Sequence, residues 1–328
     1  MDRTAGVGAV ALAGLAGCGG DTAPGSTGDA SGTTYKIGVL QLTEHTALDA
    51  ANDGFVKALD DSGISYDIDQ QNAQNDQSAC QTIASTLVNN GCDLILAIAT
   101  PAAQAVAGAT SDIPIVGTAI TDFAASGLVE DNDAPGGNLT GTSDMNPVAD
   151  QIALLQQLLP DAQTVGLLYC TAESNSDIQV SLAEEALDGA GIGHERFTVS
   201  SSNEIQQVVE SMVGKVDAIY TPTDNTIAAG MTTVAMVANE NGLPTICGEV
   251  GMVENGGLAS VSINYEELGY RAGEMAVQIL TEGADPAEMP IETMSADECD
   301  LVYNQQTADS LGVDVSALAD EGGQDVSA

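Results

Sequence analysis

The chain has 328 residues, of which 48 are Asp or Glu and only 6 are Lys or Arg, so its formal net charge is −42. This charge repels phosphate backbones and anionic lipid surfaces, which argues against nucleic-acid binding and means that any membrane residence must come from an attached lipid. Hydrophobic residues make up 44% of the chain although it has no Trp. The roughly 295 residues after the N-terminal segment suffice for two domains of ordinary size.

The N-terminal segment has the features of an export signal. An apolar run begins near Ala5 and ends at Leu15-Ala16-Gly17-Cys18. The run is too short to span ~30 Å of hydrocarbon, so we expect residues 1–17 to be a signal peptide rather than a transmembrane helix. The final tetrapeptide resembles a bacterial lipobox, in which the cysteine is lipidated and becomes the first mature residue. The alternative is an accidental cysteine in a plain signal peptide. Residues 18–34 lack apolar periodicity and predict a disordered tether.

From residue 35 onward, short apolar strands alternate with helices of 10–15 residues. This alternation is typical of βαβ units and a parallel sheet. In the first half, Leu48, Phe55 and Leu59 mark one face of an amphipathic helix. The expected elements of this half are strands at 36–40, 64–68, 94–98 and 113–116, and helices at 46–62, 76–89 and 101–109.

The same rhythm starts again after Pro147. We expect helices at 147–159, 175–190, 203–213 and 225–240, and strands at 165–169, 194–199, 218–220 and 245–247. The fold class is therefore α/β, with two doubly wound, Rossmann-like lobes and a hinge. Because the first lobe is one unit short, a later segment should return to it. The expected division is 35–144 plus about 259–285 for lobe 1, 145–258 plus about 286–315 for lobe 2, and a polar, frayed tail at 316–328.

Catalytic and metal-binding signatures are missing from the sequence. It has no G-x-S-x-G elbow and no H-E-x-x-H. The Gly214-Lys215 pair lacks Walker spacing, and the two histidines, His45 and His194, fall in different lobes. We therefore expect no enzyme activity, no cofactor and no metal site.

Five cysteines follow Cys18, so at least one of them is unpaired in a monomer. Cys80 and Cys92 look like neighbours, but the helix expected between them carries the chain over 13 Å at ~1.5 Å per residue. A disulfide needs Cα atoms within ~7 Å, so we expect this pair to stay reduced.

Several motifs together resemble one family, the tryptophan/tyrosine-type substrate-binding proteins of ABC importers. The order and spacing of the motifs, rather than any one of them, carry the resemblance across residues 35–312. The motifs are Gln41-Leu42-Thr43-Glu44-His45, Thr100-Pro101-Ala102-Ala103-Gln104, Asn138-Leu139-Thr140-Gly141-Thr142-Ser143-Asp144, Glu173-Ser174-Asn175-Ser176, Pro222-Thr223-Asp224-Asn225-Thr226 and Tyr265-Glu266-Glu267-Leu268-Gly269.

The resemblance implies a type I periplasmic-binding-protein fold with three crossings between the lobes. It also implies an extracytoplasmic, lipid-anchored protein that captures a small ligand and delivers it to ABC permease and ATPase subunits. The implied ligand is an amino acid, and the aromatic preference comes from the resemblance alone. A ligand-binding sensor on the same fold remains an alternative, as do a branched-chain amino acid, a nucleoside or a small peptide as ligand.

Candidate binding residues follow from the position of ligands in open parallel sheets, beyond the carboxyl ends of the strands. Polar residues in the loops at these ends are the candidates. They are Glu44, His45, Thr100, Thr118 and Asp122 in the first lobe, and Asn175, Ser176, Asp224, Asn225 and Glu249 in the second.

An amino acid needs acceptors for its ammonium group and donors for its carboxylate. Asp224 is a candidate for the ammonium partner, or else a plain helix cap. Thr100 and Asn175-Ser176 open helices whose N-termini could hold the carboxylate, or they too serve as caps. His45 could contact the ligand or cap the first helix. Tyr169, Tyr220 and Tyr265 could line a side-chain pocket, although core packing is the favoured interpretation.

Overall fold

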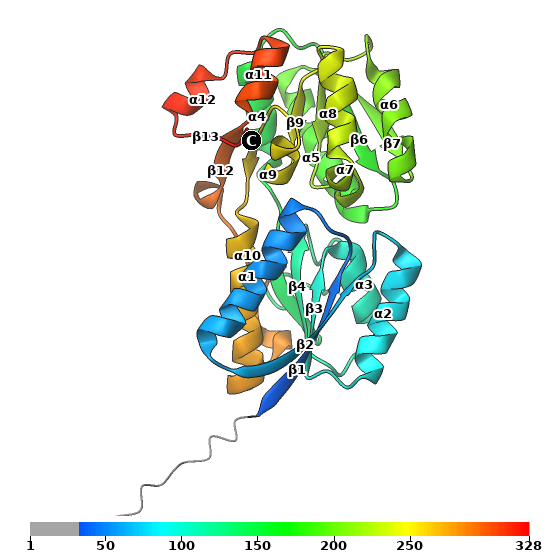
Figure 1. Cartoon of the computed structure of the whole chain (residues 1–328), viewed down its shortest axis with the longest axis vertical. Helices are drawn as coiled ribbons and strands as arrows, with labels where there is room; N and C mark the ends of the chain where they lie inside the picture. The colour runs from blue at the N-terminus through cyan, green and yellow to red at the C-terminus, as the bar shows by residue number, and fades with distance from the viewer. Residues whose placement is uncertain (1–32, 328) are drawn as a thin grey trace, which may run out of the picture. The chain divides into compact units, whose positions relative to one another are not determined.

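The structure is a computed structural model that describes residues 33–327 (Figure 1). The expected signal peptide 1–17, the lipidation site Cys18 and nearly all of the tether 18–34 lie outside the described residues. The described chain forms two mostly parallel β-sheets, one of six strands and one of seven. The prediction of two doubly wound α/β lobes is confirmed.

All strand pairs of the first sheet are parallel, in the order β11-β5-β4-β3-β1-β2. β3 and β4 are buried along their whole length, which is typical of central strands covered by helices on both faces. The predicted strands at 64–68 and 113–116 exist but continue to residues 72 and 120. The bounds are β1 (Thr34–Gln41), β2 (Ser65–Asn72), β3 (Leu94–Ile98), β4 (Ile115–Ile120), β5 (Leu139–Ser143) and β11 (Glu292–Thr293).

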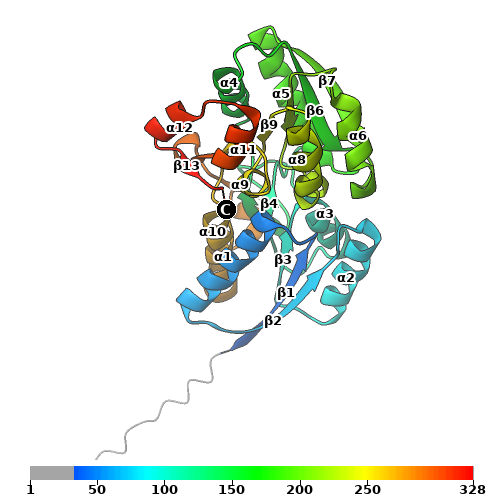
Figure 2. The same cartoon turned by 45° about the horizontal axis from the view of Figure 1, so that its top comes forward.

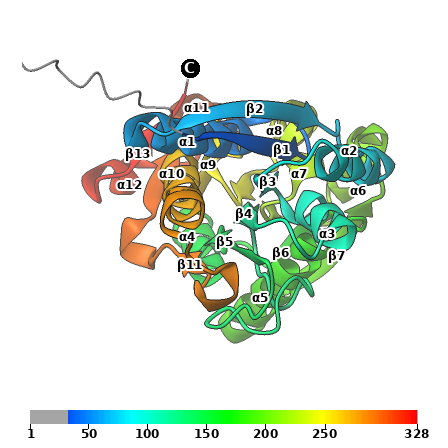
Figure 3. The same cartoon turned by 90° about the horizontal axis from the view of Figure 1, so that it is seen from below.

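Helices cover both faces of this sheet, as the view in Figure 3 shows. α1 (Thr46–Ser62) and α10 (Tyr265–Val277) lie on one side, and α2 (Gln77–Asn89) and α3 (Thr100–Ala109) lie on the other. The predicted apolar face of α1 is confirmed, because its buried residues include Leu48, Phe55 and Leu59. The short helices η2 (Gln278–Glu282) and η3 (Pro286–Glu288) follow α10.

Glycines allow α1 and α10 to pack in direct backbone contact. A Cβ atom on Gly54 would lie 2.0 Å from the carbonyl oxygen of Glu266, and one on Gly269 would lie 1.9 Å from that of Ala51. Such distances are far below van der Waals contact, so only glycine fits at these two positions. This contact attaches α10 to the first lobe, as expected for a segment that returns to it.

The second sheet has the order β13-β12-β10-β9-β8-β6-β7. β10 and β12 are antiparallel, and the other pairs are parallel. The core strands of both sheets follow the same order, 2-1-3-4-5 counted along each lobe, which is one of the two common doubly wound arrangements. The bounds are β6 (Thr164–Cys170), β7 (Gly193–Val199), β8 (Ala218–Thr221), β9 (Thr245–Cys247), β10 (Ala259–Ser262), β12 (Asp300–Tyr303) and β13 (Gln324–Asp325).

Two apolar clusters fill the space above and below the second sheet. Alternate residues of β6 belong to different clusters, with Leu167 packing in the cluster of α4 and α5, and Leu168 in that of α6 and α8. The helical bounds are α4 (Val148–Leu158), α5 (Ser174–Ala190), η1 (Ser202–Glu204), α6 (Ile205–Met212), α7 (Asn225–Ala229), α8 (Met231–Glu240), α9 (Val250–Glu254), η4 (Ala296–Glu298), α11 (Gln305–Leu311) and α12 (Ser316–Asp320).

The chain crosses between the sheets three times, from β5 to α4, from β10 to α10 and from β11 to β12. After the second crossing, α10 lies beside α1 of the first lobe (Figure 2). Two boundaries differ from the expected ones. Residues 259–262 form β10 of the second sheet, although they were expected in lobe 1, because this strand completes the second 2-1-3-4-5 set. Residues 292–293 pair with β5 of the first sheet, although they were expected in lobe 2.

Two further expectations need correction. The predicted helix 225–240 is two helices, α7 and α8, which separate at Gly230. Residues 316–325 are not a frayed tail, since Leu318 is fully buried and β13 pairs with β12.

Within residues 33–327, the cysteines Cys80, Cys92, Cys170, Cys247 and Cys299 are all free, so the prediction that Cys80 and Cys92 do not pair agrees with the structure. Over the same range, none of the helices combines the length and apolar character needed to cross a membrane.

Candidate functional site

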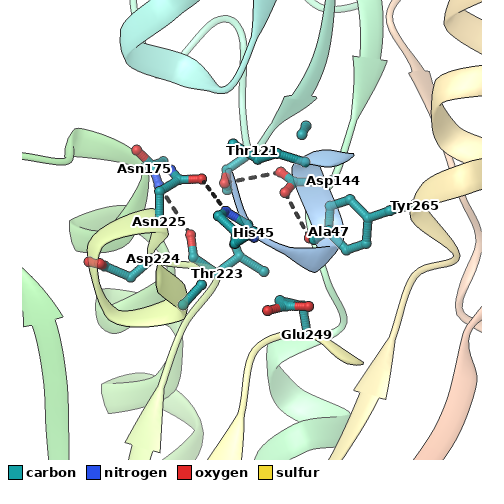
Figure 4. Close-up of a pocket in the computed structure, with 13 residues that line it drawn as sticks. His45, Ala47, Thr121, Asp144, Asn175, Thr223, Asp224, Asn225, Glu249 and Tyr265 are labelled. Carbon is teal, nitrogen blue, oxygen red and sulfur yellow. Dashed lines mark hydrogen bonds between the residues drawn. The ribbon is translucent and has the colours of Figure 1, made fainter. Parts of the chain in front are cut away.

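A small cavity lies between the loops at the carboxyl ends of the two sheets (Figure 4). Its volume is about 10 Å³, the space of a single water molecule, within about 280 Å³ of surrounding empty space that is partly open to solvent. This is the position that parallel sheets favour for ligands, and both lobes contribute walls. The lining residues are His45, Ala47, Leu48, Ala119, Thr121, Asp144 and Tyr265 from the first lobe and its crossings, and Asn175, Thr223, Asp224, Asn225, Ala228 and Glu249 from the second.

His45 connects the two walls. It occupies the N-cap position of α1 but makes no side-chain capping bond. Its Nε2 lies 3.1 Å from Oδ1 of Asn225 in the second lobe (Figure 4). Its Nδ1 is buried with no hydrogen-bond partner among the described residues. Burial lowers the pKa of His45 because it removes the water that would solvate the imidazolium.

Hydrogen bonds determine which nitrogen of His45 carries the proton. The Nδ2 of Asn225 donates to Glu173 at 2.6 Å, so its Oδ1 must be the atom that faces His45. An amide oxygen only accepts, so His45 donates through Nε2–H. The unpartnered Nδ1 of the neutral ring is therefore an acceptor.

Asp144 provides the acidic group of the first lobe. It directly follows β5 at a crossing between the lobes. Its Oδ2 accepts from the hydroxyl of Tyr265 at 2.9 Å, and its Oδ1 from the hydroxyl of Thr121 at 3.3 Å (Figure 4). Burial raises the pKa of this carboxyl to about 6, against the lowering effect of its two hydrogen bonds.

Two carboxylates of the second lobe cap helices. Asp224 caps α7 by accepting from the backbone N–H of Ile227, and it also accepts from the backbone of Cys170 and the hydroxyl of Ser176. Its carboxylate points away from His45 in Figure 4. Burial, followed by the negative charge of Glu173, raises the pKa of Asp224 to about 8.

Glu249 caps α9 through the backbone N–H groups of Gly251 and Met252. Burial raises its pKa to about 7. Both capping carboxylates therefore have structural roles, whether or not they also reach a ligand.

The hydrogen-bonding character of the cavity is dominated by acceptors. Three of its lining residues are carboxylic acids, and none is Lys or Arg. A second unpartnered atom is Oδ1 of Asn175, whose Nδ2 donates to the carbonyl oxygen of Thr223. A cavity with carboxylates and free acceptors favours a ligand that carries an ammonium group.

The structure brings five of the ten predicted site residues to the cavity wall, namely His45, Asn175, Asp224, Asn225 and Glu249. The other five lie elsewhere. Glu44 is exposed, Ser176 is buried behind Asp224, and Asp122 bonds within its own loop to Ala125 and Asn132.

Thr100 and Thr118 are buried but do not line the cavity. Ala99, at φ 82°, takes the N-cap position of α3 that was expected for Thr100. A bulge in β4 points Thr118 at Thr142, at a distance of 2.9 Å between hydroxyls, and places Ala119 at the cavity. Ala119 has a φ of 53°, a backbone conformation that alanine rarely adopts and that often occurs near functional sites.

Asp144, Thr121, Thr223 and Ala119 line the cavity but are not among the ten predicted site residues, and core packing was the favoured interpretation for Tyr265. Asp144 stands at the end of a quoted motif and just after a strand, which is a signal that could have selected it. Tyr169 and Tyr220, in contrast, pack in the core of the second lobe, as favoured.

The protein has two lobes built on mostly parallel sheets, three chain crossings between them and a cavity at the strand ends. These features define a binding protein of the type I periplasmic-binding-protein fold. The chain belongs to the ABC transporter substrate binding protein family, whose sequence profile matches residues 36–320. It is 44% identical over 280 residues to a tyrosine-binding protein of Clostridioides difficile strain R20291, an alignment covering 84% of this chain and 80% of the relative.

Solved structures agree with this assignment. The ABC domain from Streptococcus pneumoniae in complex with L-Trp is 42% identical and superposes with a TM-score of 0.84, covering 88% of this chain and 98% of that one. The ligand-free, open structure of a Clostridium difficile substrate-binding protein with adhesive properties is 45% identical but has a TM-score of 0.66, covering 86% and 96%. At similar identity, the present lobe arrangement matches the ligand complex better than the open form.

Proposed function

We propose that the protein captures an aromatic amino acid, L-tyrosine or L-tryptophan, between its lobes and delivers it to an ABC importer. The observation that carries this proposal is a cavity lined by both lobes that combines buried acceptors with a helix N-terminus lacking a side-chain cap. The names of the two relatives, a tyrosine-binding protein and a domain in complex with L-Trp, support the ligand class.

Asp144 is the proposed charged partner of the ligand ammonium group, and His45 Nδ1 and Asn175 Oδ1 are further free acceptors on the cavity wall. Asp144 differs from Asp224 and Glu249 in that side-chain hydroxyls, rather than helix N–H groups, are its partners. An ammonium group donates three hydrogen bonds and would compensate its buried charge.

The N-terminus of α1 is the proposed partner of the ligand carboxylate. Ala47 and Leu48 in its first turn line the cavity, and the N-cap side chain of His45 leaves the first N–H groups without a capping bond. Free N–H groups and the positive end of the helix dipole favour an anion here. The N-termini of α7 and α9 are already occupied by Asp224 and Glu249.

Tyr265, Leu48, Ala119 and Ala228 provide apolar surface for the ligand side chain. A thermal-shift screen of the twenty amino acids, nucleosides and sugars tests the ligand class. A compound at 100 times its Kd stabilises the protein by ~2.7 kcal/mol, which gives a clear shift in Tm. A shift with nucleosides or sugars and none with amino acids would overturn the proposal.

Anchoring and transport are parts of the same proposal. Cleavage before Cys18 and lipidation of its sulfur would hold the mature protein at the outer face of the membrane on the tether 18–34, within reach of permease and ATPase subunits. In a bacterial host, Cys18→Ala should release the protein or leave it unprocessed. Membrane partition and mature mass identical to wild type would contradict lipidation.

The protein acts by binding rather than catalysis in this proposal. Closure and release need no bond to be made or broken. Mass spectrometry of L-tyrosine recovered after long incubation with the purified protein should show the unchanged amino acid. Any product formed at a rate proportional to protein concentration would contradict a purely binding role.

A further inference from the structure

Among residues 33–327, four hydrogen bonds join the two lobes away from the chain crossings. Two of them end on neighbouring residues at the start of α7. Oδ1 of Asn225 faces His45, and Oγ1 of Thr226 accepts from Nδ2 of Asn75 at 2.9 Å. The other two join Gln77 to the carbonyl oxygen of Ala172, and Gln179 to Thr121. We use the term clasp for the pair formed by Asn225 and Thr226 with His45 and Asn75.

Glu173 organises the half of the clasp that lies in the second lobe. One of its carboxylate oxygens accepts from the backbone and the side-chain nitrogen of Asn225, at 3.0 and 2.6 Å. The other accepts from the backbone and the hydroxyl of Thr226, at 2.9 and 2.8 Å. Glu173 is buried, is not part of the cavity wall, and does not cap its own helix, α5.

These four bonds use the backbone N–H groups of both residues, one N–H of the Asn225 amide and the hydroxyl proton of Thr226. The atoms left facing the first lobe are therefore an amide oxygen and a hydroxyl lone pair, both acceptors. The first lobe presents the matching donors, His45 Nε2–H and Asn75 Nδ2.

Backbone hydrogen bonds also fix the half of the clasp that lies in the first lobe. Gln74 and Asn75 have φ values of 52° and 60°, in the left-handed region that is unusual for Gln and common for Asn in turns. The backbone N–H of Asn75 donates to the carbonyl oxygen of Leu42, and that of Gln74 donates to the side chain of Asn72. The loop thus holds the Asn75 amide toward Thr226 at a conformational cost, which suggests that this contact is functional.

We propose that Glu173 is a positioning residue for ligand capture, which acts through Asn225 and Thr226 to stabilise the closed form without touching the ligand. This inference rests on the proposed function. Apparent affinity scales with the fraction of protein in the binding-competent closed form. Removal of Glu173 should therefore weaken ligand binding although Glu173 itself is not part of the cavity wall.

We use the term relay for the proposed action of Glu173 on Asn75 through Thr226. Glu173 and Asn75 do not contact each other, so coupling between them in a double-mutant cycle tests the relay. With L-tyrosine and L-tryptophan as probes in calorimetry, Asn75→Ala should weaken binding roughly fivefold, the effect of one neutral hydrogen bond. In the Glu173→Ala background the same substitution should cost less than about twofold, since Thr226 is no longer held. Equal effects in both backgrounds would overturn the proposal.

Three further variants separate positioning from folding. Asp217→Ala removes another carboxylate that accepts two backbone N–H groups, those of Gln163 and Thr164, and should leave affinity unchanged. If Glu173→Ala fails to fold, Thr226→Val replaces it, and Asn75→Ala should then add nothing. Thr226→Ser keeps the hydroxyl and should restore wild-type binding. A Thr226→Ser protein as weak as Thr226→Val would refute the relay.

Failure of the proposed function has a different signature. If the wild-type protein binds neither L-tyrosine nor L-tryptophan, the ligand assignment is wrong. The relay is then tested without ligand, by measuring amide hydrogen exchange over residues 222–229. Asn75→Ala should then accelerate exchange in the wild type and not in Glu173→Ala. Identical acceleration in both proteins, or none in either, refutes the relay.

Discussion

Replacing Asp144 by Asn should weaken ligand binding and increase the folding stability of the ligand-free protein. An Asn side chain has nearly the same shape, its amide oxygen can accept from Tyr265, and its amide nitrogen can donate to Thr121. The substitution therefore removes the charge and keeps both contacts. An acid whose role is to hold an ammonium group should show these two opposite effects, which a purely structural residue would not.

The magnitude of the stability effect follows from the pKa. Burial raises the pKa of Asp144 to about 6 in the folded protein, from an ordinary value of 3.8. A raised pKa means that the folded state binds the proton more tightly than the unfolded state, so the ionised form costs stability as pH rises. Above pH 7 the full difference of about 2 units corresponds to about 3 kcal/mol, and at pH 4 the cost falls to about 0.5 kcal/mol. Asp144→Asn should recover most of this cost at pH 8 and little of it at pH 4.

The binding effect has the opposite sign. Loss of a charged hydrogen bond to the ligand ammonium group costs about 1.5–3 kcal/mol, or roughly a 10- to 150-fold increase in Kd for L-tyrosine. Urea unfolding at pH 4 and pH 8 and calorimetry at pH 8 measure the two effects. Asp122→Asn, in the loop after β4 but outside the cavity, is the matched control and should leave Kd unchanged.

A stabilised Asp144→Asn protein with wild-type affinity would place the ammonium group elsewhere. A variant destabilised at both pH values would mean that the hydrogen bonds of Asp144, not its charge, govern its effect on stability.

Three other outcomes are expected. Ligand binding at pH 6.5 should release protons, because a nearby ammonium group lowers the raised pKa values of Asp144 and Glu249, which are about 6 and about 7. Calorimetry in buffers of different ionisation enthalpy measures the number of protons released. Uptake of protons on binding would contradict this prediction. The ligand-free protein should have a lower Tm at pH 8.5 than at pH 5, because these two acids and Asp224, with a pKa of about 8, bind protons more tightly in the folded state. Repulsion within the net charge of −42 lowers the Tm in the same direction. Adding 1 M KCl should raise the Tm more at pH 8.5 than at pH 5, and a Tm that does not depend on salt would contradict the contribution of charge repulsion. Gly269→Ala should destabilise the protein by about 1–3 kcal/mol through its clash with Ala51, whereas Gly108→Ala, in α3 with open space around it, should be neutral or stabilising in urea unfolding.

The elements that the sequence predicts well are those fixed by local pattern. The apolar run Leu94–Ile98 forms β3, and the periodic face of residues 46–62 forms α1. The break at Gly230 escaped detection because the apolar period continues through it, whereas in the structure the side chain of Ile205 occupies the space that a Cβ there would need. The swap of residues 259–262 to the second sheet depends on strand pairing, which no local pattern encodes.

The candidate site shows the same limit. Loops at strand ends were identified correctly, but a loop position does not say which side chain points inward. The bulge in β4 exchanges Thr118 for Ala119 at the cavity, and Ala99 displaces Thr100 from the cap of α3. Tyr265 and Asp144 meet only because two different crossings between the lobes run side by side.

The buried acids of this cavity link capture to release. Burial in the closed form disfavours the charges of Asp144 and Glu249, so closure without a ligand carries an electrostatic cost that the hydrogen bonds of the clasp oppose. An ammonium group removes that cost, which makes closure favourable with an amino acid inside. When the ligand leaves, the cost returns, and opening solvates the carboxylates again. The buried acids thus make closure less favourable without a ligand than with one. This difference in free energy is part of what shifts the lobes from open to closed when an amino acid binds.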